Sequence, residues 1–155
     1  LEGMDAHLER SDAPGEWTTR EVLSHLLFEP GFDPAATLAT FSERDFPLLE
    51  IAPGDTYLDE QRRQLTLSQF RDALDAQPRR VLEYIEGLEE SAFERRRARI
   101  PLFKQFMGTD EITMAMYLGA MFDYHWNDHA GQLEKIRQAV GLGSNAAAQP
   151  GGARA

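Results

Sequence analysis

Apolar residues recur at helical intervals along much of the chain, in the pattern of one face of an amphipathic helix. The stretch WTTREVLSHLLFE, residues 17–29, shows this pattern clearly. Thr18 and Glu21 stand at the separation of a capping box, in which each side chain bonds the free backbone amide of the other. We therefore predict a helix that begins at Thr18 and ends at Pro30-Gly31, because a proline followed by a glycine stops a helix.

Two longer helices are predicted in the second half of the chain. The first covers residues 68–88, with Ser68 as its N-cap and Pro78 expected to kink or split it. The second begins at Thr109 or Asp110 and runs to about Val140, where glycines follow as stop signals. Its inward face is formed by Leu118, Met121, His125, His129, Leu133, Ile136 and Val140.

The remaining segments carry weaker signals. Three apolar positions near the start predict the end of a first helix: Leu1, Met4 and Leu8. Residues 31–66 contain a short predicted helix from Asp33 to Phe41 and are otherwise irregular, and a connection of this length permits a crossover. No stretch alternates with period two, so no strands are expected. The sequence predicts an all-α bundle of about four main helices.

Length and composition limit the classes of protein. At 155 residues with 42% hydrophobic content, the chain is expected to form one domain, residues 1–141, followed by a disordered low-complexity tail, residues 142–155. No apolar run approaches the roughly 18 residues that cross a bilayer, so no membrane is expected as a partner. The absence of cysteine excludes disulfides and thiolate ligands and is compatible with the cytoplasmic location that we expect. A net charge of −10 argues against nucleic acid as a partner.

Two histidines interrupt the apolar face of the last predicted helix. His125 and His129 lie one turn apart, about 6 Å along the axis, and can converge on one ion with bonds of about 2.0–2.1 Å. His25 also points inward from the first predicted helix, whereas His7 is expected at the surface. On spacing alone, ordinary packed or partly exposed histidines have slightly more weight than a metal site. The presence of three of the four histidines on inward faces gives the two interpretations about equal weight.

Two segments resemble a known family. EWTTREVLSHLLFE is similar to the W-[ST]-x-x-E-[VL]-x-x-H-L segment of the DinB-like (YfiT-type) superfamily, and FDYHWNDHAGQLEKIRQ is similar to its H-x-x-x-H-x-x-Q-[IL] last helix. Gln132 stands at the expected position after the second histidine. The order of predicted helices is also similar, so the resemblance spans about residues 1–141. It departs at the front, because the family's first helix is normally longer than the segment before Pro14.

The resemblance implies a four-helix bundle with a long crossover between the second and third helices. It also implies one divalent metal ion held by His25, His125 and His129, with nickel or zinc as the first choice and manganese or iron as alternatives. Some members resemble thiol S-transferases that activate bacillithiol, mycothiol or glutathione. We expect this activity here, with a small-molecule thiol and an electrophile as partners. The alternatives are a thiol-dependent isomerase, a non-catalytic metal-binding stress-response protein, and a bundle without metal.

Other side chains near the histidines have simpler interpretations. Glu29, Asp123 and Asp128 could orient an imidazole, but solvated helix charges are the more common outcome. Trp17 is interpreted as a packing anchor at the helix entry. The apolar residues of 114–126 surround too much of the helix for one pocket, so part of them is expected in the core and part in a homodimer interface.

Overall fold

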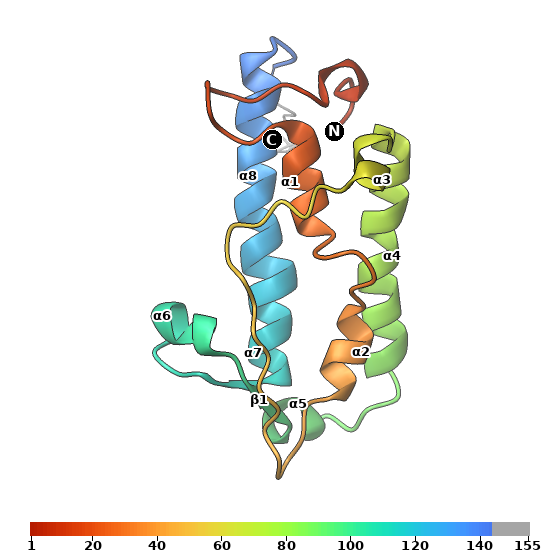
Figure 1. Ribbon diagram of the computed structural model, residues 1–155. Helices are drawn as coiled ribbons and strands as arrows, with labels where there is room; N and C mark the ends of the chain where they lie inside the picture. The colour runs from red at the N-terminus through yellow and green to blue at the C-terminus, as the bar shows by residue number, and fades with distance from the viewer. Residues whose placement is uncertain (144–155) are drawn as a thin grey trace, which may run out of the picture.

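The computed structural model describes residues 1–143, so most of the tail predicted at 142–155 lies outside the described residues. The described chain is mostly helical, as the sequence predicted. Three helical columns lie side by side (Figure 1). They are α1 (Thr19–Leu26) with α2 (Pro34–Ala39) below it, α4 (Leu67–Ile85), and a last column that ends in α8 (His125–Ala139).

The capping box predicted for α1 is present. The hydroxyl of Thr18 accepts a hydrogen bond from the Glu21 amide at 3.2 Å, and the Thr18 amide donates to the Glu21 carboxylate at 2.8 Å. The helix ends earlier than predicted, at Leu26. Phe28 follows with a φ of 59°, and a right-handed helix does not continue through a left-handed residue. Pro30-Gly31 therefore lies in the loop beyond the helix.

The start of α4 differs from the prediction. Its N-cap is Thr66 rather than Ser68, and Thr66 forms a capping box with Gln69. The amide of Thr66 donates to the Gln69 side chain at 2.8 Å, and the Gln69 amide donates to the Thr66 hydroxyl at 3.2 Å. Ser68 could not form such a box, because the residue at the matching position is Arg71, whose side chain accepts no hydrogen bond.

Pro78 does not split α4, which continues through it to Ile85. A proline inside a helix removes one backbone hydrogen bond. The packing on both sides compensates for that loss, since Leu74 and Val81, which flank the proline, are both buried. The prediction of one helix over this region is therefore confirmed, and of the two effects expected of Pro78, the split does not occur.

Two short strands are present where none was expected. β1 (Arg97–Arg99) and β2 (Glu111–Thr113) pair antiparallel, with Ala98 opposite Ile112. Both of these central side chains are 0% exposed. A strand this short has a single inward position, which is too few to reveal an alternation of period two.

β2 occupies the place where the last helix was predicted to begin. The column starts directly after β2, and its N-cap is Thr113 instead of Thr109 or Asp110. It consists of α7 (Met114–Leu118), a π-helical stretch η3 (Gly119–Tyr124), and α8. Stretches of π-helix inside α-helices are often found at functional sites.

Short helices complete the fold. Between the strands, η2 (Pro101–Phe103) and α6 (Lys104–Met107) stand away from the columns in Figure 1. The others are η1 (Asp5–His7), α3 (Glu60–Arg63) and α5 (Ala92–Arg95). Among the described residues, no helix is long and apolar enough to cross a membrane.

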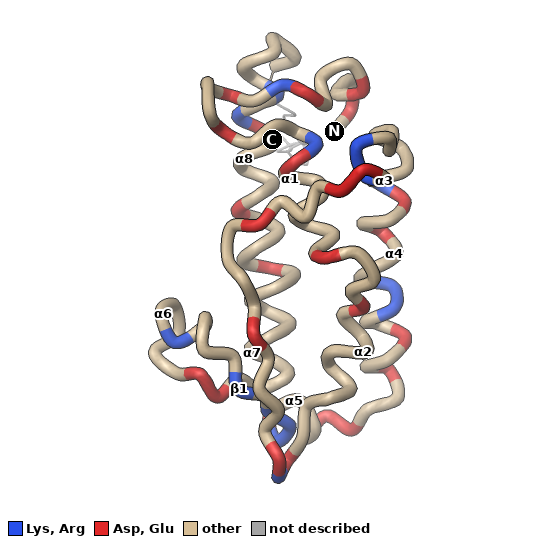
Figure 2. Tube along the Cα trace, in the orientation of Figure 1, with Lys and Arg blue, Asp and Glu red and all other residues tan. Residues whose placement is uncertain are grey.

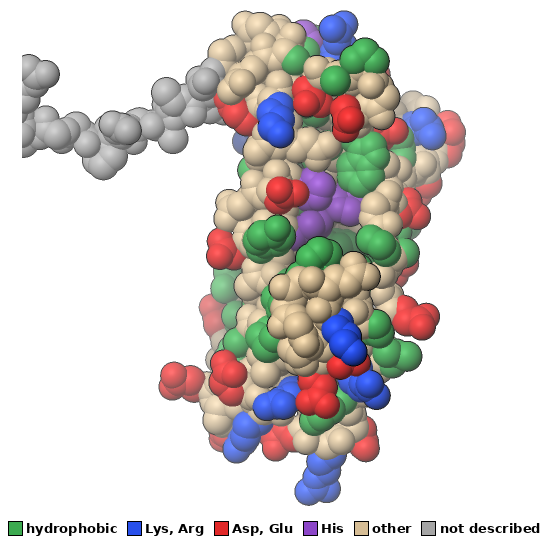
Figure 3. All heavy atoms as spheres, turned by 90° about the vertical axis from the view of Figure 1, so that its left-hand side faces the viewer, with side chains coloured by type: hydrophobic (Ala, Val, Ile, Leu, Met, Phe, Trp, Pro, Cys, Tyr) green, Lys and Arg blue, Asp and Glu red, His purple; other side chains and the backbone are tan. Residues whose placement is uncertain are grey.

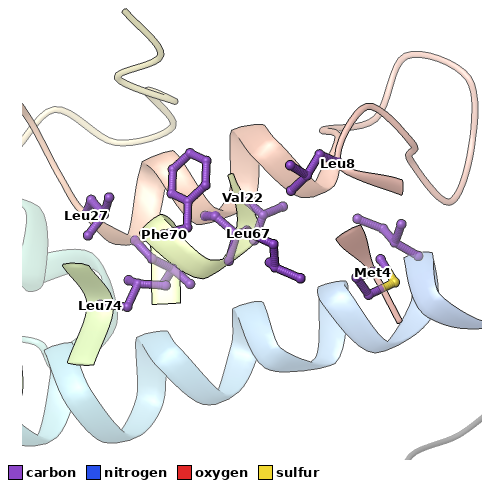
Figure 4. Packing of buried hydrophobic residues seen from close by; sticks show 10 residues of the cluster. Met4, Leu8, Val22, Leu27, Leu67, Phe70 and Leu74 are labelled. Carbon is purple, nitrogen blue, oxygen red and sulfur yellow. The ribbon is translucent and has the colours of Figure 1, made fainter. Parts of the chain in front are cut away.

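The buried apolar side chains form two clusters. The upper core lies between α1, α4 and α8 and includes Val22, Phe70 and Ile136 (Figure 4). The lower core lies around α2, β1, β2 and α7 and includes Leu38 and Tyr117. Because the last column passes from the lower core to the upper core, the residues at its middle lie at the level between the two clusters.

The N-terminal segment joins the upper core without forming the predicted helix end. Met4 is 1% exposed and Leu8 is 8% exposed. The backbone between them makes only the short 3-10 helix η1. The apolar spacing therefore predicted the burial correctly and the secondary structure wrongly.

Acidic residues are spread over the chain, and basic residues gather near β1 (Figure 2). The arginine run there is paired with carboxylates at the surface. Arg95 lies 3.3 Å from Glu43, and Arg99 lies 3.1 Å from Asp110. Exposed pairs of this kind contribute about 0–1 kcal/mol each, so the run is a solvated, paired stretch of the surface.

Candidate metal centre

The fold brings together the three histidines that the sequence placed on inward faces. His25 lies in the last turn of α1, and His125 and His129 lie in the first two turns of α8. The centroids of the three rings are 4.7–5.0 Å apart in each pair. Figure 3 shows histidine side chains gathered in a hollow of the surface, bordered by hydrophobic side chains. His7 does not belong to this group.

The second ring nitrogens of two histidines are held by acceptors. Nδ1 of His25 lies 2.6 Å from the carbonyl oxygen of Asp55, and Nδ1 of His129 lies 2.9 Å from Oε1 of Gln132. A carbonyl oxygen only accepts, so each Nδ1 carries the proton and donates it. The lone pair of each ring is therefore on Nε2, the atom left to bind an ion.

The donor atoms are close enough to hold one metal ion. The candidate ligand atoms of the three histidines all lie within 4.8 Å of one another, and Nε2 of His25 is 2.9 Å from Nε2 of His125. Nitrogens bonded to one ion at about 2.0–2.1 Å are separated by no more than about 4.2 Å. The rings therefore need only small movements to share an ion. Within residues 1–143, no carboxylate joins the group.

Burial keeps two of the rings neutral. The pKa of His125 is lowered to about 4, chiefly by burial and in addition by the neighbouring His129 and His25. Nδ1 of His125 is buried without a hydrogen-bond partner among the described residues, which also disfavours the charged ring. Burial lowers the pKa of His25 as well, against the hydrogen bond to Asp55. Neutral imidazole is the form that binds a metal.

Aromatic rings enclose the histidines. Trp17 stacks on His129 with an interplanar angle of 8° and lies with its ring centroid 5.0 Å from that of His25. The ring of Tyr57 lies nearly parallel to that of His25, with the two centroids 6.4 Å apart. The prediction for Trp17 was incomplete, because this side chain borders the histidine group in addition to packing at the entry of α1.

Arg62 anchors the loop that contains Asp55 and Tyr57. This buried guanidinium donates to the carbonyl of Ser24 at 3.0 Å, to the hydroxyl of Ser24 at 3.2 Å and to the carbonyl of Tyr57 at 3.2 Å. It thereby ties the loop to α1, one residue before His25. The loop residues gave no signal in the sequence, because their position depends on this long-range contact rather than on a local pattern.

The three carboxylates considered from the sequence are exposed. Glu29, Asp123 and Asp128 all lie at the surface. Asp123 accepts a hydrogen bond from Asn127 at 2.9 Å, and the charge of Asp128 raises the pKa of His125 slightly against the effect of burial. None of the three lies close enough to join the histidine group, so they behave as solvated helix charges.

A cavity of about 740 Å³ adjoins the histidines. One wall is the loop of residues 51–57, a second is formed by η2 and α6, and a third is the face of α7 and η3 that includes Met116 and Met121. All three histidines and Trp17 line one part of it. The residues between α1 and α4 and those between the strands, which appeared irregular in the sequence, therefore build the space beside the site.

Comparison of the chain with protein-family models, with curated proteins and with solved structures found no match. The site is therefore interpreted from its own residues. These residues provide three imidazoles that share one centre, acceptors that hold two of their Nδ1 protons, and an adjoining cavity.

Proposed function

We propose that the chain is a DinB-like metal-dependent protein that activates a low-molecular-weight thiol for transfer to an electrophile. His25, His125 and His129 would hold one divalent ion. The observation that carries the proposal is the convergence of these three imidazoles beside an open cavity. A thiol and a second substrate could reach the same centre through that cavity.

The order of elements supports the DinB-like assignment. We match α1, α4 and the column from α7 to α8 with the second, third and fourth helices of a DinB-like bundle. Residues 31–66 would be its long crossover. The residues before Pro14 stand in the place of its first helix. The capping box before His25 and the contact of Gln132 with His129 lie within the two segments that carry the resemblance.

The donor set suits nickel or zinc best. Imidazole ligands suit Zn²⁺, Ni²⁺, Cu²⁺ and iron, whereas Mn²⁺ prefers carboxylate and water oxygens. A divalent ion held by three neutral imidazoles lowers the pKa of a bound thiol and so supplies a thiolate at neutral pH. Asp55 and Gln132 would keep the imidazoles oriented by holding their Nδ1 protons.

Within the described part of the chain no fourth His, Asp or Glu joins the group, and this favours catalysis over a purely structural ion. Structural zinc sites usually have four protein ligands, and catalytic sites keep one position open. Among the described residues, only the three histidines form the group. A non-catalytic stress-response protein and a thiol-dependent isomerase are the alternatives, and the isomerase would use the same thiolate.

Cobalt-substituted protein provides the test. Mixing it with bacillithiol, mycothiol or glutathione should produce a sulfur-to-metal charge-transfer band, which the His129→Ala variant should lack and the His7→Ala variant should keep. The same mixture should conjugate monochlorobimane faster than the thiol alone, and a chelator should abolish the gain. If no thiol produces a band and conjugation does not depend on metal, the non-catalytic alternative is the better one.

We also propose that the protein is a cytoplasmic homodimer, with part of the last column or of its neighbour α4 at the interface. Tyr124 on the last column is 73% exposed and Leu82 on α4 is 53% exposed, so both offer apolar surface to a second copy. Light scattering should give the mass of a dimer at micromolar concentration. A monomer mass at all concentrations would contradict this part of the proposal.

A further inference from the structure

We propose that the cavity beside the histidines binds an uncharged, largely apolar molecule, which is the electrophile of the proposed transferase. The binding itself rests on the cavity and can be measured without metal. The identification of the bound molecule as the electrophile rests on the proposed function. In the transfer, the thiolate sulfur would form a bond to an electrophilic carbon, the leaving group would depart with its electron pair, and the thiol proton would go to solvent.

The size of the cavity fits a small organic molecule. Its volume of about 740 Å³ lies within the range of about 300–1,000 Å³ that is usual for ligand pockets. A molecule of two or three aromatic rings would fit within it. Because the histidines line the same cavity, such a molecule would lie directly beside the proposed metal position.

The walls of the cavity carry no formal charge. Among the described residues that line it, none is Asp, Glu, Lys or Arg. The buried guanidinium of Arg62 is directed at Ser24 and at the Tyr57 carbonyl and does not line the cavity. In the metal-free protein, an anionic group would lose its hydration there without gaining a cationic side chain as a partner. The metal-free cavity should therefore select against anions.

Two wall residues of α6 are unusually exposed for their type. Phe106 is 68% exposed and Met107 is 39% exposed, although both line the cavity. An apolar molecule in the cavity would cover part of these side chains, and the removal of their apolar surface from water would favour binding. On the opposite wall, Met116 and Met121 have flexible side chains that adapt to rings of different shape.

A pair of fluorescent probes tests the charge selection. N-phenyl-1-naphthylamine is uncharged and apolar, and 8-anilinonaphthalene-1-sulfonate has the same ring system with one sulfonate added. In metal-free protein kept in chelator, the uncharged probe should bind saturably with increased fluorescence. The sulfonate should bind at least about tenfold more weakly, because its charge would be desolvated.

Matched glycine variants test the location. Gly119 lines the cavity, and a Cβ added there meets no heavy atom within 4 Å. Gly131 has the same free space further along the column but does not line the cavity. Gly119→Trp should weaken binding of N-phenyl-1-naphthylamine at least about tenfold, and Gly131→Trp should change it less than about twofold. Ala120→Trp, at a second lining position, replaces Gly119→Trp if circular dichroism shows that variant to be unfolded.

The outcomes separate this inference from the proposed function. Equal affinity for the two probes, or binding that neither Gly119→Trp nor Ala120→Trp weakens, would overturn the cavity assignment. Selective binding of the uncharged probe by a protein that fails the cobalt–thiol test would support the cavity and refute the transferase. A positive cobalt–thiol test with no probe binding would support the transferase and refute the cavity assignment.

Discussion

Nδ1 of His129 lies 2.9 Å from Oε1 of Gln132, which is on the same side of α8 almost one turn further along. The amide oxygen accepts the Nδ1 proton, so the lone pair of the imidazole is on Nε2, the nitrogen left for an ion. Acceptors that orient metal-binding histidines in this way typically change metal affinity about 10–100-fold when removed. Gln132 is therefore a positioning residue of the proposed centre.

Replacement of Gln132 should weaken metal binding without unfolding the protein. Gln132→Leu should lower the affinity for Zn²⁺ or Ni²⁺ by about 10–100-fold in titration calorimetry, whereas Gln132→Glu, which keeps an acceptor, should retain most of it. Gln138→Leu is the control, since Gln138 lies exposed on the same helix and its side chain donates to Glu134 at the surface. Equal effects of the Gln132 and Gln138 variants would mean that the contact with His129 does not orient the ring.

Each of the three clustered histidines should be required for metal binding. His25→Ala, His125→Ala and His129→Ala should each reduce affinity by at least about 100-fold, because each removes one of three donor atoms. His7→Ala should bind as the unaltered protein does, since His7 lies outside the group. Elemental analysis of protein purified without added metal measures the occupancy. Full occupancy in the His125→Ala variant would exclude the proposed ligand set.

Arg62 should contribute both to stability and to the position of the Asp55 loop. Arg62→Ala removes three hydrogen bonds from buried or half-buried acceptors and should lower the free energy of unfolding by about 2–4 kcal/mol. Arg63→Ala is the control, because Arg63 is exposed, and it should cost less than about 0.5 kcal/mol. Urea unfolding in chelator measures both, and similar midpoints for the two variants would contradict the anchoring role.

The helical elements could be predicted because their information is local. The apolar period and the pair Thr18 and Glu21 lie within one segment, and the structure confirms both. The same period put His125 and His129 on one face of the last helix, since residues four apart lie above one another. Their convergence with His25, which is far away in sequence, was expected from the inward direction of each face together with the family resemblance.

The walls of the site could not be predicted because they depend on distant contacts. Tyr57 has a φ of 51°, a conformation that its residue type disfavours and that no local pattern indicates. The loop is held there by Arg62, and the acceptor for His25 is a backbone carbonyl, that of Asp55. Any residue type offers such a carbonyl, so the identity of the residue contains no information about this role.

The N-cap of α4 shows how a neighbouring residue decides between two local candidates. Thr66 and Ser68 are both favourable cap residues, but only Thr66 has an acceptor at the third following position, Gln69. Thr66→Ala should lower the free energy of unfolding by about 1 kcal/mol, whereas Ser68→Ala, inside the first turn, should change it by less than about 0.5 kcal/mol. Thermal unfolding monitored by circular dichroism measures the difference. The opposite order of effects would move the start of the helix to the position first predicted.

His125 should make the stability of the metal-free protein depend on pH. Its pKa is about 4 in the folded protein, below the ordinary value of 6.5, so the unfolded chain takes up the proton first as the pH falls. Below about pH 6.5 the unfolded state binds more protons than the folded state, and the free energy of unfolding decreases until about pH 4, where both states are protonated. His25, whose pKa is also lowered, acts in the same direction.

A variant that cannot titrate isolates this contribution. His125→Phe keeps a ring of similar size at the site, so its urea midpoint in chelator should fall less than that of the unaltered protein between about pH 7 and about pH 5. At about pH 7, saturating Zn²⁺ should raise the urea midpoint of the unaltered protein. This increase should disappear as the pH falls, because protons displace the ion from the imidazoles. The variant should show little response to Zn²⁺. Parallel curves of urea midpoint against pH for the two proteins in chelator would mean that His125 is solvated enough to be protonated in the folded state. The assignment of a neutral imidazole to this position would then be wrong.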